Sequence, residues 1–351
     1  CHEYNVRYQS GLKIYDRLEV LKVIRNQLVA GIWILLKLSI KLRINLFRVA
    51  VGIDKDYLYY RSLFKSYHSD FIIQERHYTT KAIKNYLFKQ MGGSISATIQ
   101  KNILQSDSMI YFSDIDWLFS LGHRGVERMN EYGGRIDRVI PVGSMFMEYY
   151  WFQFTEKIDK KLDVLMLGQN ISNSYKREDK FSKFMDDYYE CFRWLVRFKK
   201  EYPDYNVAIK HHASFFYTDK IENQIISNSN VKVLDKNENS YKIAFNSKCA
   251  VTYGSSMGYE LNAHGLPVFF IDPGLRCTSL PDKDDDLLGN LRIESYEAFR
   301  DAILDILGKK ETKNILPCNP DDFCLESSTV SNRIYDALVG NLTNSTYISK
   351  P

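Results

Sequence analysis

The sequence lacks the features that would place it in several large protein classes. Its 351 residues hold no apolar run near the ~20 residues that a membrane-spanning helix needs, and no signal-peptide pattern opens it. The six cysteines are scattered without a CxxC pair or metal-ligand spacing, as is typical of reduced cytosolic thiols. A net charge of +4 is too small to indicate nucleic acid binding. These absences predict a cytoplasmic protein without a nucleic acid partner.

The charge is concentrated at the amino end. Residues 1–50 hold nine Lys/Arg against three Asp/Glu, a balance of +6, so the remainder of the +4 total is −2. Behind an apolar run at 28–36 come four basic residues, Lys37, Lys41, Arg43 and Arg48. This pattern, which includes Trp33, predicts either a core helix with solvated lysines or a helix lying on an anionic membrane surface. Because the chain begins with Cys1 rather than Met, we expect its amino end to be incomplete.

Short apolar runs alternate with amphipathic segments along the chain. In the first half this pattern predicts strands at 71–73, 97–99, 109–112 and 139–144, and helices at 80–90 and 118–132. In the second half it predicts strands at 163–167, 207–210, 231–234, 249–252 and 268–271, and helices at 181–202, 220–227, 241–246, 258–264 and 296–307. Such alternation predicts an α/β fold with two Rossmann-like parallel sheets facing a central cleft.

Domain boundaries follow from the same pattern. Charged residues separate two strand signals near 152–162. We therefore predict an amino-terminal domain over 1–155, a second domain over 156–315, and a carboxy-terminal tail or helix over 316–351.

The stretch 251–260 follows a strand and opens a helix. A helix amino terminus offers backbone N–H groups and a positive dipole end, which suit a phosphate. Gly254 would allow close approach, Ser255 and Ser256 would add hydroxyl donors, and Glu260 could accept hydrogen bonds from ribose hydroxyls. The alternative is an ordinary strand-to-helix turn with a serine cap.

Lys210, His211 and His212 lie at the end of the predicted strand 207–210. Ligands of open parallel sheets bind outside the carboxyl ends of the strands. Histidine can donate to phosphate or serve in acid–base chemistry, although a structural role is the alternative. No third ligand is spaced for zinc, so we predict no metal site.

Two of these motifs carry a family resemblance. The segment 254–260, followed by a Gly-x-Pro turn at 265–268, resembles the donor-site signature of GT-B glycosyltransferases. With the strand and turn at 140–144, it is similar to the capsule and lipopolysaccharide transferases among bacterial surface carbohydrate biosynthesis proteins. Residues 210–212 and 255–256 resemble the "HP" and "SS" elements of bacterial sialyl- and Kdo-type transferases. Ala213 stands where the first element has proline.

The resemblance implies a set of roles. His212 would contact the phosphate of a nucleotide-activated sugar, which the resemblance to sialyl- and Kdo-type transferases implies is CMP-linked, with Ser255 and Ser256 as hydroxyl partners. Gly168, Gln169 and Asn170, after the strand 163–167, would approach the donor. The amino-terminal domain would hold a glycan or glycolipid acceptor. Cations and N–H donors would stabilise the phosphate leaving group, so neither a metal nor another cofactor is expected.

A base must accept the proton of the attacking hydroxyl, and we expect it from the first domain. The candidates by strand-end position are Glu75, Arg76 and His77 after 71–73, and Asp114 or Asp116 after 109–112. Asp114 and Asp116 have Asp-x-Asp spacing, but this spacing is common by chance. Residues 284–286, all aspartate, are predicted to form a solvated loop.

The leading hypothesis is a glycosyltransferase for a bacterial surface polysaccharide or lipopolysaccharide, located in the cytoplasm or peripherally on the inner membrane. A second hypothesis is a GT-B-like polymer phosphotransferase or sugar-nucleotide epimerase. A third is a non-catalytic scaffold of a polysaccharide assembly complex, which predicts no nucleotide binding.

Overall fold

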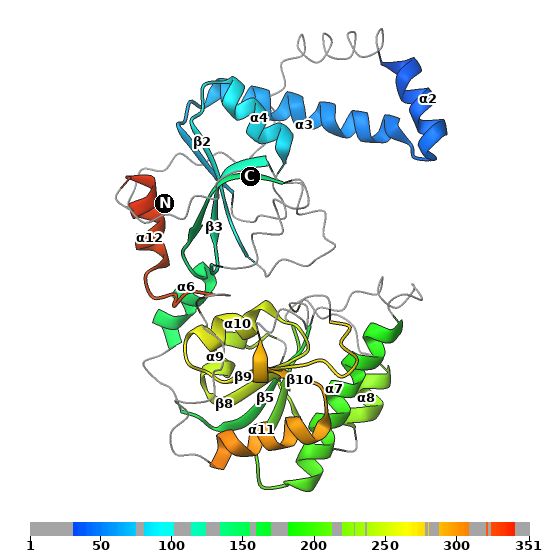
Figure 1. Cartoon of the computed structure of the whole chain (residues 1–351), viewed down its shortest axis with the longest axis vertical. Helices are drawn as coiled ribbons and strands as arrows, with labels where there is room; N and C mark the ends of the chain where they lie inside the picture. The colour runs from blue at the N-terminus through cyan, green and yellow to red at the C-terminus, as the bar shows by residue number, and fades with distance from the viewer. Residues whose placement is uncertain are drawn as a thin grey trace.

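The computed structural model describes most of the chain, and the fold is given for that part. It covers residues 31–74, 81–101, 114–123, 134–154, 159–169, 182–212, 220–227, 229–235, 237–277, 280, 288–308, 321 and 324–340. Two parallel sheets, each with its own helices, form the body of the molecule (Figure 1).

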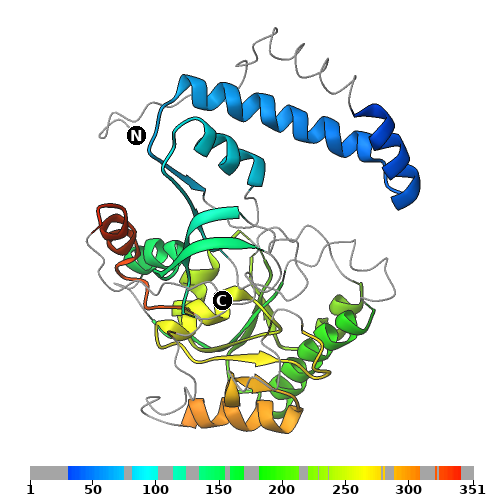
Figure 2. The same cartoon turned by 45° about the horizontal axis from the view of Figure 1, so that its top comes forward.

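A helical hairpin precedes the first sheet. Helix α2 (Ile32–Leu42) ends at Arg43, whose left-handed backbone turns the chain toward α3 (Leu46–Ser66). Asn45 caps α3, because its Oδ1 accepts a hydrogen bond from the backbone N–H of Arg48 at 3.3 Å. The far end of α3 packs on α4 (Ala82–Gln90) through buried Phe64, Leu87 and Phe88. Among the described residues, the hairpin therefore joins the body at the end of α3 that packs on α4 (Figures 1 and 2).

The first sheet has four strands in the order β1-β2-β3-β4, and all neighbours are parallel. Its strands are β1 (Phe71–Gln74), β2 (Ile95–Ile99), β3 (Asp114–Ser120) and β4 (Arg135–Pro141). The order follows the chain, and because all neighbouring strands are parallel, their carboxyl ends lie at one edge of the sheet.

The second sheet has six parallel strands in the order β10-β9-β8-β5-β6-β7. They are β5 (Leu162–Leu167), β6 (Val207–Lys210), β7 (Lys232–Val233), β8 (Ser247–Thr252), β9 (Val268–Ile271) and β10 (Arg292–Ile293). The order departs from the chain order at β5, between β6 and β8. In doubly wound sheets, ligands bind at such a switch point.

Helices cover both faces of the second sheet. One core contains α7 (Ser182–Glu201), α8 (Lys220–Ile226) and α11 (Tyr296–Gly308). The other contains α6 (Met145–Phe154), α9 (Ser240–Phe245) and α10 (Ser256–Ala263). A short 3-10 helix, η6 (Gly289–Leu291), precedes β10.

The chain crosses between the two sheets twice. Helix α6 starts after β4 yet packs on the second sheet, where the Tyr150 ring stacks on Tyr241 at 4.8 Å. Helix α12 (Val330–Leu338) returns to the first sheet, and its Val330 and Ile334 pack with Phe119. These observations confirm the predicted α/β fold with two parallel-sheet domains. Within the described residues, no helix is long and apolar enough to cross a bilayer.

The sequence prediction was wrong around β3. Residues 118–120, predicted to begin a helix, complete this strand. The predicted strand 109–112 lies outside the described residues, as does the rest of the predicted helix after 123. Aspartate is a poor strand former, but β3 pairs on both sides with β2 and β4, and partners on these strands hold its two aspartates. Tertiary pairing therefore overrides local propensity.

Candidate functional site

Three central strands of the second sheet end in the same row. Leu167 of β5 pairs with Lys210 of β6 on one side and with Thr252 of β8 on the other. The backbone N–H of Gly168 donates to the carbonyl of Lys210 at 2.9 Å, and the Thr252 hydroxyl donates to the carbonyl of Leu167 at 3.0 Å. The turns at 168–169, 211–212 and 253–255 therefore lie side by side. Most of the donor-binding residues predicted from the sequence fall on these turns.

The turn after β8 directs the amino end of α10 toward this row. Ser255 is the cap residue of α10, yet its side chain makes no capping hydrogen bond. Its backbone N–H donates to the Thr252 hydroxyl at 3.2 Å, which fixes the turn between strand and helix. Gly258 lets the helix approach β9, because a Cβ there would lie 2.9 Å from the Phe270 ring. The N–H groups and positive dipole end of α10 thus lie beside Gly254, Ser255 and Ser256.

His211 is held by a buried acid. Its Nε2 lies 2.9 Å from a carboxylate oxygen of Glu222, and both side chains are nearly buried. On its other side, a Cβ on Gly168 would lie 3.3 Å from both His211 Nδ1 and the Tyr188 hydroxyl. A side chain at 168 would therefore require these two groups to move by a few tenths of an ångström. The Nε2 of His211 is therefore already paired within the protein.

His212 lies among positive charges. Burial lowers the pKa of His212, and the charges of Lys210 and Lys101 lower it further. Lys210 is buried, its Nζ donates to the carbonyl of His211 at 2.8 Å, and burial also lowers its own pKa. Like charges gathered in one place favour binding of an anion, which would reduce their repulsion.

Lys101 was missed by the sequence analysis. It follows β2 of the first sheet, and its Nζ lies 5.1 Å from the centre of the Phe146 ring. Its charge lowers the pKa of His212 and acts on the carboxyl of Glu260. The first sheet therefore contributes a cation to the same region. The signal was available, because Lys101 follows a predicted strand just as the selected histidines do.

Glu260 lies where the two halves of the chain meet. Its Oε1 accepts a hydrogen bond from the Ser144 hydroxyl, and its Oε2 accepts one from the Tyr241 hydroxyl, both at 2.6 Å. Burial raises the pKa of Glu260, although these two hydrogen bonds and the charge of Lys101 oppose the change. The sequence predicted a ribose contact here. Since both oxygens are bonded within the protein, a ribose hydroxyl could bind only by replacing or sharing one of these partners.

Of five other predicted site residues, the structure describes Gln169 but not the remaining four. The backbone N–H of Gln169 donates to the Tyr188 hydroxyl at 3.3 Å, which places it in the row of turns. Asn170, Glu75, Arg76 and His77 lie outside the described residues. β1 ends at Gln74, so Glu75 and His77 follow a strand end, as predicted.

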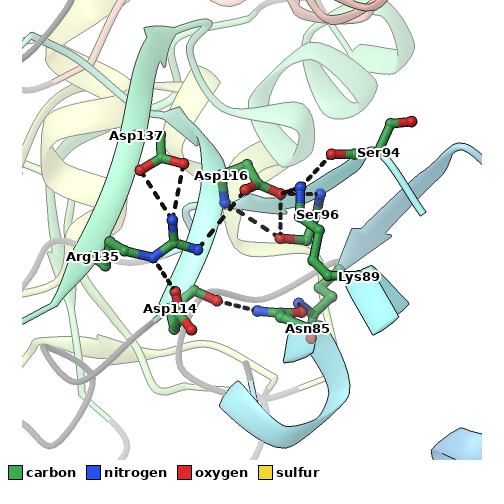
Figure 3. Close-up of polar contacts among 9 residues, drawn as sticks. Asn85, Lys89, Ser94, Ser96, Asp114, Asp116, Arg135 and Asp137 are labelled. Carbon is green, nitrogen blue, oxygen red and sulfur yellow. Dashed lines mark hydrogen bonds and ion pairs between the residues drawn. The ribbon is translucent and has the colours of Figure 1, made fainter. Parts of the chain in front are cut away.

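Asp114 and Asp116 lie at the opposite edge from the one expected (Figure 3). β3 begins at Asp114, so both residues open the strand rather than follow one. Asp116 Oδ2 accepts hydrogen bonds from the backbone N–H and the hydroxyl of Ser96 at 2.6 and 2.8 Å, and lies 2.9 Å from Lys89 Nζ. Asp114 pairs with Arg135. The two residues therefore lie within β3 and not after its carboxyl end, while the predicted strand 109–112 that they were expected to follow lies outside the described residues.

The surroundings of Asp116 explain its charge state. Burial is the largest influence and raises the pKa of Asp116, but hydrogen bonds from Lys89 and Ser96 and the charge of Lys89 outweigh it. The pKa of Asp116 therefore lies below its usual value. Within the described part of the chain, no group of three or more His, Cys, Asp or Glu side chains is arranged to hold a metal ion.

Comparisons with known proteins identify the fold. No protein-family model matches the sequence, and no curated protein matches it. A putative UDP-N-acetylglucosamine 2-epimerase from Listeria monocytogenes aligns with a TM-score of 0.55 and 10% identity, over 82% of this chain and 78% of that one. S. aureus MnaA with UDP aligns at 0.55 and 10%, over 85% and 84%. UDP-GlcNAc 2-epimerase from Neisseria meningitidis bound to UDP-GlcNAc aligns at 0.52 and 11%, over 80% and 79%. At such identities the likeness shows the fold alone, which is the GT-B type.

Proposed function

We propose that the chain is a nucleotide-sugar enzyme that holds the donor phosphate at the carboxyl edge of its second sheet. The observation that carries this proposal is the register of β6, β5 and β8, which aligns the three turns described above beside the start of α10. Backbone N–H groups, two serine hydroxyls and cationic side chains supply what a phosphate needs.

Each residue then has a defined part in the proposed chemistry. Gly254, Ser255 and Ser256 bind phosphate oxygens at the start of α10, and His212 and Lys101 approach from the neighbouring turn and from the first sheet. Negative charge grows on the phosphate as the sugar leaves, so these fixed positive groups stabilise the transition state more than the ground state. Glu75 and His77, which follow β1, stay our candidates for the base that activates the acceptor.

Within this class we propose a glycosyltransferase that extends a bacterial surface polysaccharide or lipopolysaccharide in the cytoplasm. The support is the resemblance of residues 254–260 and 265–268 to the GT-B donor signature. The acceptor is a glycan or glycolipid. UDP is the first nucleotide to test, because two of the similar structures contain UDP or UDP-GlcNAc. CMP is the second, from the partial match of residues 210–212 and 255–256.

The second candidate is a sugar-nucleotide epimerase. The specific observation in its favour is that the similar structures described above are UDP-GlcNAc 2-epimerases or, in one case, a complex with UDP. The same phosphate site would serve both reactions. An epimerase changes the sugar without an acceptor, whereas a transferase releases nucleotide only when an acceptor is present.

The test is a thermal-shift screen of the wild type, His212→Ala and His68→Ala with UDP, CMP, GDP and CDP. A nucleotide at a hundredfold excess over its Kd stabilises the folded state by about 2.7 kcal/mol. We expect a nucleotide to stabilise the wild type and His68→Ala, because His68 is exposed and precedes β1 at the amino edge of the first sheet. We expect a smaller shift in His212→Ala. Product analysis with UDP-GlcNAc, with and without a glycan acceptor, then separates the two activities. No shift with any nucleotide would contradict both and support a scaffold.

A further inference from the structure

Helix α2 is apolar around most of its circumference, with Lys37 and Lys41 on one side, yet none of its residues is buried. Eight of its eleven residues are Ile, Leu or Trp. Trp33 and Ile40 are 74% and 71% exposed, and Ile34 and Leu42 are also exposed. A helix that is apolar all round normally lies in a protein core or in a membrane. The described residues therefore leave the apolar surface of α2 uncovered.

The exposed apolar surface continues beyond α2. Arg43 turns the chain, the Ser39 hydroxyl accepts a hydrogen bond from the backbone N–H of Leu46, and α3 begins. Ile44, Val51 and Ile53 are exposed as well, Val51 by 67%. We call the surface formed by residues 31–53 the α2–α3 tip. It lies at the end of the hairpin away from the two sheets (Figures 1 and 2), so a large flat partner could reach it without touching the body.

The charges of the tip have one sign. It holds four exposed cations, Lys37, Lys41, Arg43 and Arg48. No Asp or Glu occurs from Gly31 to Ile53. Apolar side chains interleaved with cations suit a layer that offers hydrocarbon below a negatively charged surface. Tryptophan also favours the boundary between hydrocarbon and water.

The same charges argue against a second copy of the chain as the partner. Bringing two tips together would place eight cations around one apolar contact, and like charges across an interface oppose association. The helix is also too short to span a membrane, since eleven residues extend about 16 Å and a bilayer core is about 30 Å thick. The geometry fits a helix lying within the lipid surface.

We propose that the α2–α3 tip docks this protein on anionic lipid, with the apolar side chains of α2 inserted among the acyl chains and its cations among the headgroups. This inference is independent of the proposed enzymatic activity. It distinguishes between the two possibilities that the sequence left open for the basic amino-terminal segment, a core helix and a membrane-surface helix.

Vesicle flotation of the full chain tests the proposal. We expect binding to vesicles of phosphatidylcholine with 30% phosphatidylglycerol, and binding on the order of tenfold weaker to phosphatidylcholine alone or at high salt. Trp33→Glu/Ile40→Glu should lower binding to both compositions at least tenfold. Lys37→Glu/Lys41→Glu should lower binding to the anionic vesicles and remove the preference for them.

Two control variants sharpen the experiment. Tyr335→Glu changes another exposed aromatic residue, 65% exposed on α12, and should bind as the wild type does. Trp33→Phe keeps the helix apolar, so it should bind vesicles, but the blue shift of tryptophan fluorescence seen on binding in the wild type should be lost. Loss of the blue shift would show that it comes from Trp33 and not from the other three tryptophans, Trp117, Trp151 and Trp194.

Three results would overturn the proposal. The first is no flotation of folded wild type with either lipid. The second is equal loss of binding in Tyr335→Glu and in the tip variants. The third is a dimer in analytical ultracentrifugation that Trp33→Glu/Ile40→Glu dissociates while vesicle binding is unchanged, which would assign the tip to a second copy.

Discussion

Two edges of the molecule gather charged residues in opposite ways. At the amino edge of the first sheet, carboxylates and cations alternate: Asp116 meets Lys89, and Asp114 meets Arg135 (Figure 3). At the carboxyl edge of the second sheet, cations act on one another, because Lys210 and Lys101 both lower the pKa of His212, although Glu222 lies beside His211 and the charges of Glu238 and Asp235 act on Lys210. An edge whose charges neutralise one another stabilises the fold. Cations that repel one another bind an anion favourably.

The largest expected effect is a loss of stability when the buried contacts at the amino edge of the first sheet are removed. Asp116→Ala should lower the free energy of unfolding by about 3 kcal/mol, because it leaves the buried N–H of Ser96 without its acceptor and removes the partner of Lys89. Nucleotide affinity should not change. Denaturant unfolding measures the loss, and Asp137→Ala, an exposed carboxylate on the same edge, is the matched control and should cost under about 1 kcal/mol.

The pH dependence of Asp116 follows from its lowered pKa. The charged form of the Asp116 carboxyl is more stable in the folded protein than in the unfolded chain. The contribution of this carboxylate to stability is therefore fully present above the unfolded pKa of about 3.9, and it is lost as pH falls through the lower pKa of the folded protein. The stability difference between the wild type and Asp116→Asn should be constant near neutral pH and shrink below about pH 4. A difference that grows with acid would contradict the assigned partners.

The second effect concerns the carboxyl edge. His212→Ala should weaken nucleotide binding about tenfold, or ~1.4 kcal/mol, with little loss of stability. Because burial and two cations lower the pKa of His212, it becomes charged only below its ordinary value near 6.5. Nucleotide affinity of the wild type should therefore rise as pH falls through that lowered pKa. Calorimetry at several pH values would show this rise in the wild type and a smaller one in His212→Ala.

A somewhat smaller effect tests whether the first sheet contributes to the site. Lys101→Ala should weaken nucleotide binding about fivefold, or ~1 kcal/mol, and Lys101→Arg should restore most of it. Lys89→Ala is the matched control on the other edge, and should lower stability without changing affinity. If Lys89→Ala weakened binding as much as Lys101→Ala, the distinction between the two edges would fail.

The smallest effect lies on the exposed rim of the amino edge. Arg135 pairs with Asp114 and Asp137, but all three side chains are more than 40% exposed. Exposed pairs contribute ~0.5 kcal/mol each. Arg135→Ala should therefore shift the thermal midpoint by only a few degrees. A loss comparable to that of Asp116→Ala would show that the rim is stabilising in its own right.

The second sheet was predicted well because its elements are locally consistent. The strands at 207–210 and 268–271 were placed residue for residue, and helix 258–264 was found close to α10. Here apolar runs, glycine turns and helix caps agree with the fold. The same consistency let the carboxyl-edge rule select Lys210 to His212, and let the helix amino terminus after the strand 249–252 select Gly254, Ser255 and Ser256, from sequence alone.

The first sheet and the contacts between the halves were harder to predict. β3 opens with Asp-Ile-Asp, whose acidic residues disfavour a strand until Ser96 and Arg135 are brought near by folding. The hydrogen bond between Ser144 and Glu260 joins residues 116 positions apart, and no local pattern encodes it. Lys101 was missed for a different reason, because in that half the strand-end rule was applied after the predicted strands 71–73 and 109–112 but not after 97–99.

Hydrogen–deuterium exchange with saturating UDP, and in parallel with CMP, tests the central claim most directly. The account predicts that one nucleotide slows amide exchange in peptides covering 210–212 and 253–258, with no change in peptides covering 85–96 and 114–116. Protection confined to the latter peptides, or none with either nucleotide in a well-folded sample, would contradict it.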